Sequence, residues 1–512
     1  MKDESPKVNN IVVSAKQMQH IESRIFAAGM PVAALMEKAA NLCFRKIVEL
    51  YPLDEVTSVG VIIGSGHNGG DALVIARELH LAGYTVKIYQ ALAKQKELTA
   101  AHCKYAVSLG IAVVQSVDSI QDCDLIIDGL FGFGLTRKVT GQLAEDINKL
   151  NSWQKPVIAI DLPSGIHTDT GAVLGTAVKA KHTLCLGLWK KAFMQDDAIA
   201  YMGNPIKLDF GITDADITAA IPSEQTIQLF DRNTARETIP LPRAAVTHKY
   251  QQGNLLLIAG SRRYQGAAIL NALGARKSGV GMLTIMVPES LASLLVSQVP
   301  EALVVGCPET TSGAIATLPL ESPELDKYDA IAVGSGLTTE ALPIMQQLIA
   351  LDTPLIIDAD GLNILATLPR ETWINQNQLR ILTPHLGEFK RLFPEISASP
   401  DRLTMAQQAA QISNSIILLK GAQTAITDSS GKTWVISRST PGLARGGSGD
   451  VLTGLLGGLL AQQPEKPLLT TALSAWLHAQ AGISAAEANT ELGVDGVTLA
   501  QFLTMAINSL KI

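Results

Sequence analysis

Short runs of apolar residues that end in glycine or in a polar residue recur along the whole chain. Val59 to Ile63 leads into a glycine-rich segment, while Asp124 to Asp128 and Val157 to Asp161 each end in an aspartate. Apolar runs of this length between turn residues are typical of strands buried on both faces, as in parallel sheets. Stretches with helical spacing follow them, so the pattern predicts an α/β fold built from strand–loop–helix units.

The alternation of strands and helices lapses once. Residues 212–242 contain several prolines and mixed polar residues, and a new strand then begins over 254–259. A change of this kind marks a domain junction. We therefore predict a Rossmann-like, doubly wound, three-layer α/β domain over residues 1–225, followed by a second α/β domain over residues 226–512.

Two helices are expected before the first of these strands. Residues 14–28 carry apolar or small residues at helical spacing, and Pro31 opens a second helix with an apolar side. This side could pack against another subunit or against the core of its own domain. We expect the protein to form a homo-oligomer.

A glycine-rich segment over residues 64–71 joins a strand to a helix expected over 72–81. Its glycines satisfy the GxGxxG pattern of dinucleotide-binding turns, but the next strand ends at Gln90 without an acidic residue for a ribose hydroxyl. The segment also carries Asn68 and Asp71, which a plain pyrophosphate turn does not require. We interpret it as part of a binding site. The alternative is a turn in which Asp71 only caps its helix.

Two strands of the first half end in an aspartate, Asp128 and Asp161, and each leads into a loop containing glycine or proline. The carboxyl ends of parallel strands form the ligand crevice of an α/β sheet. We therefore expect these two carboxylates to converge with segment 64–71. A single aspartate in this position is often only a turn cap, but two of them beside an asparagine-bearing loop favour a functional site.

Strands of the second half also end in glycine and polar residues, and segment 443–454 is the most distinctive of these ends. It places three glycines and a serine before Asp450, with a buried helix expected over 451–461. Glycine N–H groups and a helix N-terminus together favour an anion. An aspartate fits there if it takes a proton from a hydroxyl group that is about to meet a phosphoryl group. The alternative is a glycine cap followed by a helix-capping aspartate.

Two further residues follow predicted strands of the second half. His385 comes after a strand-ending Thr-Pro pair, and we expect it to face the same crevice. Lys420 precedes Gly421 and could be a solvated lysine at a strand end or a ligand of a nucleotide phosphate. No His, Cys, Asp or Glu cluster has the spacing of a zinc site.

Composition and charge narrow the class of protein. The 512 residues suggest two to four domains, and 41 basic against 47 acidic residues give a net charge of −6, which does not call for nucleic acid. Five cysteines without CxxC spacing indicate reduced thiols. The polar N-terminus lacks a signal-peptide core, and no apolar stretch is long enough to span a membrane. We expect a cytoplasmic protein without a membrane partner.

Several motifs together resemble a known enzyme family. Those similar to the NAD(P)H-hydrate epimerase domain are Gly66-His67-Asn68-Gly69-Gly70-Asp71, Asp128-Gly129-Leu130-Phe131-Gly132-Phe133-Gly134 and Asp161-Leu162-Pro163-Ser164-Gly165. Those similar to the ADP-dependent NAD(P)H-hydrate dehydratase domain, which has a ribokinase-like fold, are His248-Lys249, Ala259-Gly260-Ser261, Thr383-Pro384-His385-Leu386-Gly387-Glu388, Lys420-Gly421 and Gly446-Gly447-Ser448-Gly449-Asp450-Val451-Leu452. Their order is that of the bifunctional bacterial enzyme, and the match covers nearly the whole chain.

The resemblance implies a role in cofactor repair. Water adds across the 5,6 double bond of the nicotinamide ring of NADH or NADPH and gives hydrates, NADHX and NADPHX, that dehydrogenases cannot use. The epimerase of this family interconverts the R and S hydrates. The dehydratase acts on the S form and consumes ADP, yielding AMP, phosphate and NAD(P)H.

The resemblance also implies the site residues. In the first domain a potassium ion would be bound by Asn68, Asp128 and Ser164. The hydrate there would be bound by His67, Asn68, Gly69, Gly70, Asp71, Gly132, Phe133, Gly134, Leu135, Thr136, Arg137, Lys138 and Asp161. In the second domain the hydrate would contact Ala267, Gly336, His385 and Asp450. The adenine nucleotide would be held by Lys420, Gly421, Ala422, Gln423, Thr424, Gly446, Gly447, Ser448 and Gly449.

Asp161 and Asp450 would be the catalytic residues, and magnesium is expected from phosphoryl transfer. Four positions depart from the family pattern, namely His67, Ala72, Tyr250 and Arg445. Two other functions fit the same residues. The chain could be an ATP-dependent kinase of a small-molecule hydroxyl group fused to a ligand-binding domain, or its first half could be a non-catalytic binding module or scaffold.

Overall fold

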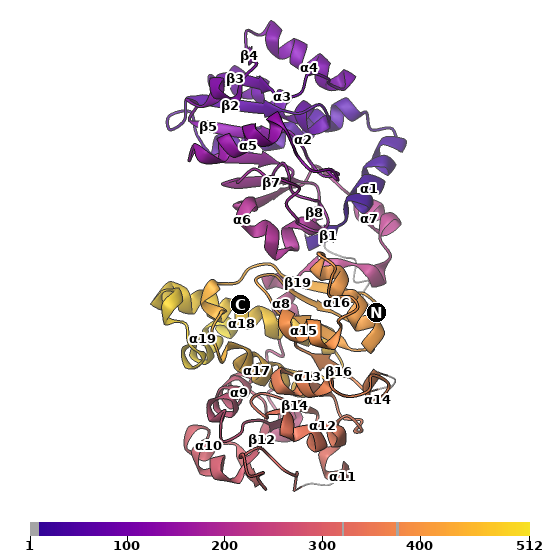
Figure 1. Ribbon diagram of the computed structural model, residues 1–512, viewed down its shortest axis with the longest axis vertical. Coiled ribbons are helices and arrows are strands. Elements are labelled where there is room, and N and C mark those ends of the chain that lie inside the picture. The colour runs from indigo at the N-terminus through magenta and orange to yellow at the C-terminus, as the bar shows by residue number, and fades with distance from the viewer. Residues whose placement is uncertain (1–9, 320–321, 375–377, 512) are drawn as a thin grey trace. The chain divides into compact units, whose positions relative to one another are not determined.

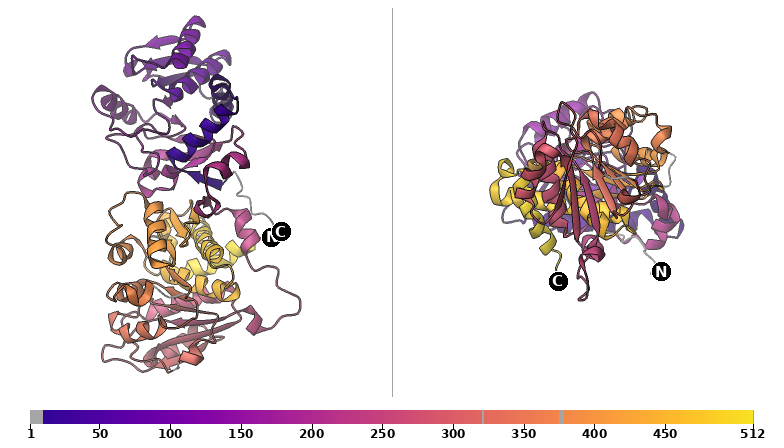
Figure 2. Two further views of the ribbon diagram at one scale, coloured as in Figure 1. Left: turned by 90° about the vertical axis from the view of Figure 1, so that its right-hand side faces the viewer. Right: turned by 90° about the horizontal axis from the view of Figure 1, so that it is seen from below.

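The computed structural model describes residues 10–319, 322–374 and 378–511. Contacts within the chain divide it into two compact units, Met1–Thr226 and Ile227–Ile512. In each unit helices cover both faces of a largely parallel sheet (Figures 1 and 2). The α/β fold class predicted from the sequence is confirmed.

The sheet of the first unit has the strand order β4-β3-β2-β5-β6-β7-β9, and every pair of neighbours is parallel. Strand β1 pairs in parallel with β8. The strands are β1 (Ile11–Val13), β2 (Ser58–Ile63), β3 (Thr85–Gln90), β4 (Ala112–Val114), β5 (Leu125–Gly129), β6 (Val157–Ile160), β7 (His182–Leu186), β8 (Trp189–Lys190) and β9 (Asn204–Leu208). The helices are α1 (Ala15–Ala27), α2 (Val32–Leu50), α3 (His67–Leu81), α4 (Glu97–Ser108), α5 (Gln142–Ser152), α6 (Ile199–Met202) and α7 (Asp214–Ala220).

The direction of this order reverses between β2 and β5, because the chain moves from β2 to β3 and β4 on one side and from β5 to β6 and β7 on the other. Such a switch point opens a crevice at the carboxyl ends of the strands. The glycine-rich segment 64–71 follows β2, and Asp128 lies at the end of β5. The topology therefore brings together segment 64–71 and Asp128, as the sequence predicted.

Helix α3 begins at His67, so the predicted start at residue 72 was wrong. Its first turn contains Gly69 and Gly70, which have helical geometry and are needed for close packing. A Cβ atom on Gly69 would lie 2.2 Å from the carbonyl oxygen of Gly64, and one on Gly70 would lie 2.7 Å from the Met36 side chain. Segment 64–71 is therefore a short loop followed by a helix N-terminus.

The sheet of the second unit has the order β13-β12-β11-β14-β15-β16-β17-β18-β19-β10. It is parallel from β13 to β17, β18 and β19 form an antiparallel hairpin, and β10 is parallel to β19. The strands are β10 (Ile227–Leu229), β11 (Asn254–Ile258), β12 (Met282–Pro288), β13 (Leu303–Cys307), β14 (Ala330–Val333), β15 (Leu355–Ile357), β16 (Arg380–Leu382), β17 (Ile416–Leu419), β18 (Thr424–Thr427) and β19 (Thr433–Ile436).

The helices of the second unit pack on both faces of this sheet. They are α8 (Arg232–Thr238), α9 (Gln265–Ser278), α10 (Ala292–Gln298), α11 (Ser322–Leu325), α12 (Leu342–Leu348), α13 (Ala359–Leu365), α14 (Glu371–Ile374), α15 (Leu386–Leu392), α16 (Arg402–Ser413), α17 (Ser448–Gln462), α18 (Pro467–Asn489) and α19 (Gly496–Asn508).

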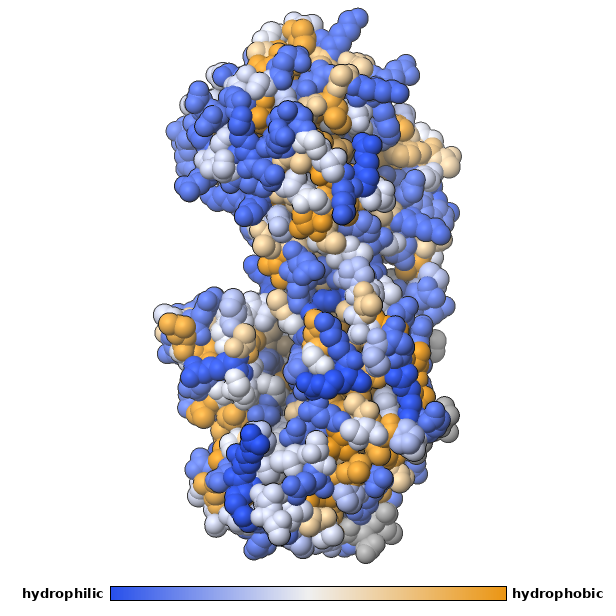
Figure 3. Space-filling view, in the orientation of Figure 1, coloured by the Kyte–Doolittle hydropathy of each residue, from blue (hydrophilic) through white to orange (hydrophobic). Residues whose placement is uncertain are grey.

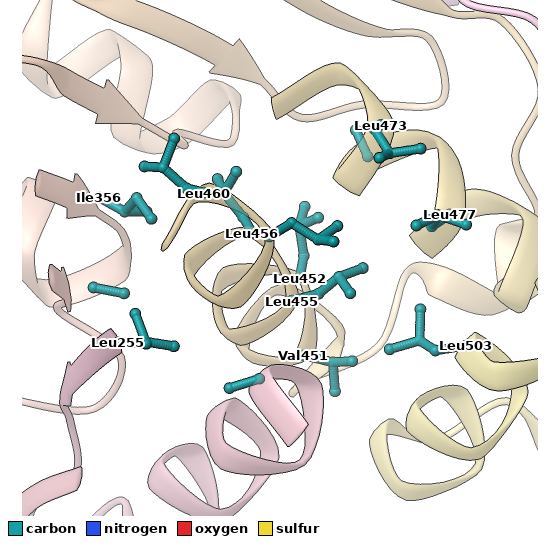
Figure 4. Close-up of a cluster of buried hydrophobic side chains, with 14 of the residues drawn as sticks. Leu255, Ile356, Val451, Leu452, Leu455, Leu456, Leu460, Leu473, Leu477 and Leu503 are labelled. Carbon is teal, nitrogen blue, oxygen red and sulfur yellow. The ribbon is translucent and has the colours of Figure 1, made fainter. Parts of the chain in front are cut away.

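Helix α17 is the centre of the second core. It contacts α9, α18, α19 and strands β11 and β14, and its leucines meet those of α18 and α19 (Figure 4). Glycines allow α9 and α17 to approach closely, since a Cβ atom on Gly454 would lie 1.8 Å from the Asn271 carbonyl oxygen. The helix begins at Ser448, and the predicted start at residue 451 was wrong. Asp450 therefore lies in its first turn.

The N-terminal helices and the surface can be compared with the expected homo-oligomer and the expected lack of a membrane partner. Helices α1 and α2 place their apolar sides in the core of their own unit, so this pattern alone does not indicate a subunit interface. On the face drawn in Figure 3, hydrophilic residues are interspersed with hydrophobic ones. Within the described part of the chain no helix is long and apolar enough to cross a membrane. The five cysteines are free thiols, and four of them are buried.

Candidate active sites

A cavity of about 390 Å³ lies at the carboxyl ends of β2, β5 and β6 in the first unit. Its walls include segments from α1, α2 and the loops that follow the three strands. The predicted site residues that line it are His67, Asn68, Asp71, Gly132, Phe133, Gly134, Leu135, Arg137 and Asp161. Thr136 and Lys138 belong to the same loop but do not line the cavity, and Gly69 and Gly70 lie behind it in α3.

Asp161 is the most constrained residue of this cavity. Its backbone has a φ of 66°, a left-handed conformation that costs a non-glycine residue about 1–3 kcal/mol. One carboxylate oxygen lies 2.5 Å from Nζ of Lys190, and the other accepts a hydrogen bond of 2.9 Å from the Phe133 N–H group. These contacts hold the carboxylate in one orientation. Gly132 lies against it, since a Cβ atom added to this glycine would be only 3.1 Å from the carboxylate.

Lys190 is completely buried beside Asp161. Burial alone lowers the pKa of Lys190, but Asp161, together with Cys185 and Glu22, outweighs that effect and raises the pKa above its usual value. The two groups therefore form a charged pair, and Lys190 also donates to the Leu186 carbonyl oxygen at 2.5 Å. A second carboxyl group, Glu22 of α1, lines the same cavity, and burial raises its pKa to about 7.

Asp128 lies behind the cavity and has only neutral partners among the described residues. It accepts hydrogen bonds from the N–H groups of Leu130 and Ser164, at 3.2 and 2.8 Å, and from the Ser164 hydroxyl group at 2.6 Å. Burial raises the pKa of Asp128 to about 6, although the Ser164 hydrogen bonds oppose this. The backbone carbonyl oxygen of Asn68 is close by, since it would lie 3.3 Å from a Cβ atom on Gly129. The buried amide Nδ2 of Asn68 has no hydrogen-bond partner in the described part of the chain.

The second unit has a polar cluster centred on Asp358, which directly follows β15. Its carboxylate accepts hydrogen bonds from Lys420 at 2.7 Å, Thr383 at 2.8 Å and Thr453 at 2.7 Å. Burial alone raises the pKa of Asp358, but the Lys420 ammonium group and its hydrogen bond outweigh it and keep the pKa below its usual value. Burial alone lowers the pKa of Lys420, but Asp358, together with Glu388 and Asp450, outweighs that effect and raises the pKa. The pair fixes a positive charge at the end of β17.

Asp450 faces this cluster from the first turn of α17. Burial raises the pKa of Asp450 to about 6, and the nearby Asp358 carboxylate adds to the shift. A Cβ atom on Gly449 would lie 3.5 Å from the Lys420 ammonium nitrogen, so the glycine leaves room between that ammonium group and the helix N-terminus. A group able to accept a proton thus lies beside a fixed cation and the N–H groups of a helix start, which together favour an anion.

The remaining predicted residues of the second site surround this centre. Gly336 has a left-handed φ of 68°, and a Cβ atom there would lie 2.9 Å from that of Ala267, so these two residues are neighbours. His385 is exposed and caps α15, where its Nδ1 accepts from the Gly387 N–H group at 2.9 Å. The other predicted residues lie at two chain segments. Gly421, Ala422 and Gln423 form the turn between β17 and β18, and Thr424 begins β18. Gly446 and Gly447 directly precede α17, and Ser448 and Gly449 begin it.

Comparison with known proteins relates each of the two units to a family. Residues 32–192 match the family described as YjeF-related protein N-terminus, and residues 255–504 match the family described as NAD(P)H-hydrate dehydratase. The bifunctional NAD(P)H-hydrate repair enzyme Nnr of Synechocystis sp. is 51% identical over 97% of this chain and 94% of its own length. The chain belongs to the family of bifunctional NAD(P)H-hydrate repair enzymes.

Other members of this family are also similar. The enzyme of Thermosynechococcus vestitus is 49% identical over 94% of this chain and 94% of its own. Among solved structures, an ADP/ATP-dependent NAD(P)H-hydrate dehydratase from Bacillus subtilis, co-crystallised with ATP and Mg²⁺, is 30% identical, covers 55% of this chain and 98% of its own, and has a TM-score of 0.49. Membership of the family confirms the two kinds of domain, and their order, that the motifs predicted.

Sequence reasoning missed several residues that shape both sites. Lys190 and Glu22 belong to no motif, because a lysine in a short strand and a glutamate on an amphipathic helix are ordinary surface patterns. Asp358 could have been found, since it follows a strand in the same way as Asp128 and Asp161. His478 of α18 was also missed; burial lowers its pKa to about 4, and its neutral ring lies 2.9 Å from the Ser448 carbonyl oxygen.

Proposed function

We propose that this chain repairs hydrated nicotinamide cofactors, with residues 1–225 interconverting the R and S hydrates of NADH and NADPH and residues 226–512 dehydrating the S hydrate with ADP. The observation that most supports this proposal is the position of Asp450, a proton acceptor beside Lys420 at the N-terminus of α17. A kinase needs the same arrangement, but the first unit supplies a second site that a kinase would not require. The free, mostly buried cysteines support a cytoplasmic location. A homo-oligomer is part of the same proposal.

In the second unit Asp450 takes the proton of the hydrate's hydroxyl group, and the oxygen attacks the β-phosphate of ADP. The N–H groups at the start of α17 and the Lys420 ammonium group stabilise the charge that develops on the transferring group. AMP leaves, and phosphate then departs from the ring carbon as a good leaving group. Loss of a proton from the neighbouring carbon restores the dihydropyridine ring.

Magnesium is the expected cation for this phosphoryl transfer. No group of three or more potential metal ligands of the His, Cys, Asp or Glu type occurs in the described residues. This fits magnesium, which is commonly held by one or two carboxylates together with nucleotide phosphates and water. When bound, the ion would neutralise phosphate charge. Asp358 and Asp360, at the start of α13, influence Asp450 electrostatically and would be candidate ligands from the protein.

In the first unit Asp128, Ser164 and Asn68 fit a potassium ion. Asp128 is a wholly buried carboxylate without a basic partner in the described residues, and Ser164 and Asn68 offer neutral oxygen atoms beside it. A monovalent cation would supply the missing positive charge. It would order the loop after β5, which carries Gly132 and Phe133 into the cavity. Asp161 then exchanges a proton with the hydrate.

We expect epimerisation to depend on potassium and dehydration of the S hydrate to be unaffected by it. Replacing potassium with tetramethylammonium, which is too large for the site, should lower the epimerisation rate at least about tenfold, because the Asp128 carboxylate loses its counter-charge. Asp128→Asn removes that charge and should make epimerisation insensitive to the cation. Equal rates in both salts would contradict the site, whatever the overall activity.

The whole function is tested by giving the protein a racemic mixture of NADH hydrates. With ADP present, we expect NADH absorbance to recover fully, since the first site converts the R form into the S form that the second site consumes. Recovery limited to half of the hydrate would contradict the epimerase assignment. A stable phosphorylated product without recovery of NADH would instead indicate a kinase. Chromatography of the nucleotides should show one AMP formed for each NADH regained.

A further inference from the structure

The cavity of the first unit contains a carboxyl group to which neither the motifs nor the proposed function assign a role. Glu22 lies on α1, far in sequence from the glycine-rich loop, yet it lines the cavity together with Asp161 and Lys190. Phe26, one helical turn further along, lines it too, whereas Met18 and Ile21 of the same helix are buried in the core. The pocket-facing side of α1 therefore presents Glu22 to whatever the cavity binds.

Glu22 has no structural task that would explain a partly buried carboxyl group. Among the described residues it has no hydrogen bond or ion pair, although Lys190, Asp161 and Asp71 are near enough to influence it electrostatically. Buried carboxyl groups without partners are costly, and they are retained mainly at functional sites. By contrast, Arg24 on the neighbouring side of α1 lies 3.9 Å from Asp216 and has an ordinary surface role.

Inversion of the hydrated carbon needs both an acid and a base. One carboxyl oxygen of Asp161 lies 2.5 Å from the Lys190 nitrogen and the other accepts from the Phe133 N–H group, so Asp161 is placed to accept a proton and a second group is needed to donate one. The hydroxyl-bearing carbon is attached to the ring nitrogen, whose lone pair can form a double bond when the hydroxyl group leaves as water. This departure requires a proton, and return of water to the opposite face releases one.

We infer that Glu22 is the second acid–base residue of this site, donating a proton on the face of the substrate ring that Asp161 does not reach. The inference rests on the proposed epimerase function. Protonated Glu22 gives its proton to the hydroxyl oxygen, the C–O bond breaks with its electrons on oxygen, and the nitrogen lone pair forms the C=N bond. Water then adds to the other face, its electrons form the new C–O bond, and Asp161 takes the proton. Solvent returns the proton from Asp161 to Glu22.

The charges around the cavity support the role of Glu22 as the proton donor. Burial raises the pKa of Glu22 to about 7, Lys190 lowers it and Asp161 raises it further, so part of the population is protonated at neutral pH. Asp71 of α3 also faces Glu22, and burial raises the pKa of Asp71 well above its usual range. The other charged or titratable residues in the cavity wall are His67, Lys96 and Arg137.

The test compares Glu22→Gln with wild type in the full chain, using R and S hydrates separately and subtracting the uncatalysed rate. Glutamine keeps the size of the side chain but carries no acidic proton, so kcat for epimerisation should fall at least about 100-fold. Dehydration of the S hydrate by the same molecule should be unchanged. Glu49→Gln is the matched control, because Glu49 is an exposed residue of α2 that pairs with Lys46; its epimerisation should equal that of wild type.

A pH profile separates a catalytic role from a merely structural one. In wild type, kcat/KM for epimerisation should fall above pH about 7 as Glu22 loses its proton, in both directions of the reaction. Glu22→Asp should retain this limb with a reduced rate, and Glu22→Gln should lose it. Epimerisation by Glu22→Gln within threefold of wild type would overturn the inference and leave the epimerase assignment intact. Absence of epimerisation in wild type would overturn both.

Discussion

Replacing Asp450 with asparagine is expected to lower kcat for ADP-dependent dehydration of the S hydrate by at least about 100-fold, because the amide cannot accept the hydroxyl proton. The measurement is the return of NADH absorbance from purified S hydrate with ADP. Interconversion of the R and S hydrates by the same variant should proceed at the wild-type rate, since that site belongs to the other unit. Full dehydration activity in Asp450→Asn would remove this residue from the mechanism.

The thermal stability of Asp450→Asn shows whether a loss of activity is caused by misfolding. The pKa of Asp450 is raised in the folded protein from 3.8 to about 6, so the folded state binds its proton more tightly than the unfolded state. Stability is therefore lost as pH rises through this range, by about 3 kcal/mol at most above pH 6. Asp450→Asn should melt at the same or a higher temperature than wild type at pH 7. A lower Tm would mean that misfolding explains the lost activity. The wild-type rate should also rise through pH about 6 as Asp450 ionises.

Replacing Asp161 with asparagine is expected to lower kcat for epimerisation by at least about 100-fold and to leave dehydration of the S hydrate intact. Racemic hydrate with ADP should then give back only about half of its NADH on the time scale of the wild-type reaction. The physical reason is that Asp161 is the carboxylate held by Lys190 and by the Phe133 N–H group against the cavity. Unchanged epimerisation would reduce the first unit to a binding module.

A second effect of this substitution has to be separated from the first. Asparagine leaves the buried Lys190 ammonium group without its counter-charge, and breaking a buried ion pair in this way costs about 3–5 kcal/mol. The double variant Asp161→Asn with Lys190→Met removes both charges. We expect it to recover most of the thermal stability lost in the single variant and none of the epimerase activity. Recovery of activity along with stability would show that Asp161 acts only on folding.

Much of the fold could be predicted from the amino-acid sequence because its signals are local. The apolar strands and the approximate helices agree with the structure. The starts of α3 and α17 were placed too late, since the sequence shows glycines and these usually indicate loops. In the structure Gly69 and Gly449 lie in the first turns of these helices. A Cβ atom on Gly69 would lie 2.2 Å from the Gly64 carbonyl oxygen, which leaves no room for a larger residue, whereas one on Gly449 would make only an ordinary contact with the Lys420 nitrogen.

Some residues of the candidate sites could likewise be predicted from local sequence signals, and others could not. Strand-end aspartates and glycine-rich segments are visible in the sequence, so Asp128, Asp161 and Asp450 could be named from it, and the order of the motifs pointed to the family. The sequence also placed two α/β units in succession, because strand, turn and helix signals depend on neighbouring residues. Only the tertiary structure brought Lys190 to Asp161, Lys420 to Asp358 and Glu22 to the cavity wall. Lys190 and Asp161 are 29 positions apart in the sequence, and Lys420 and Asp358 are 62 apart. Glu22 belongs to a helix and Asp161 to a loop after a strand. No local sequence pattern encodes such contacts, because only the folding of the sheet creates them.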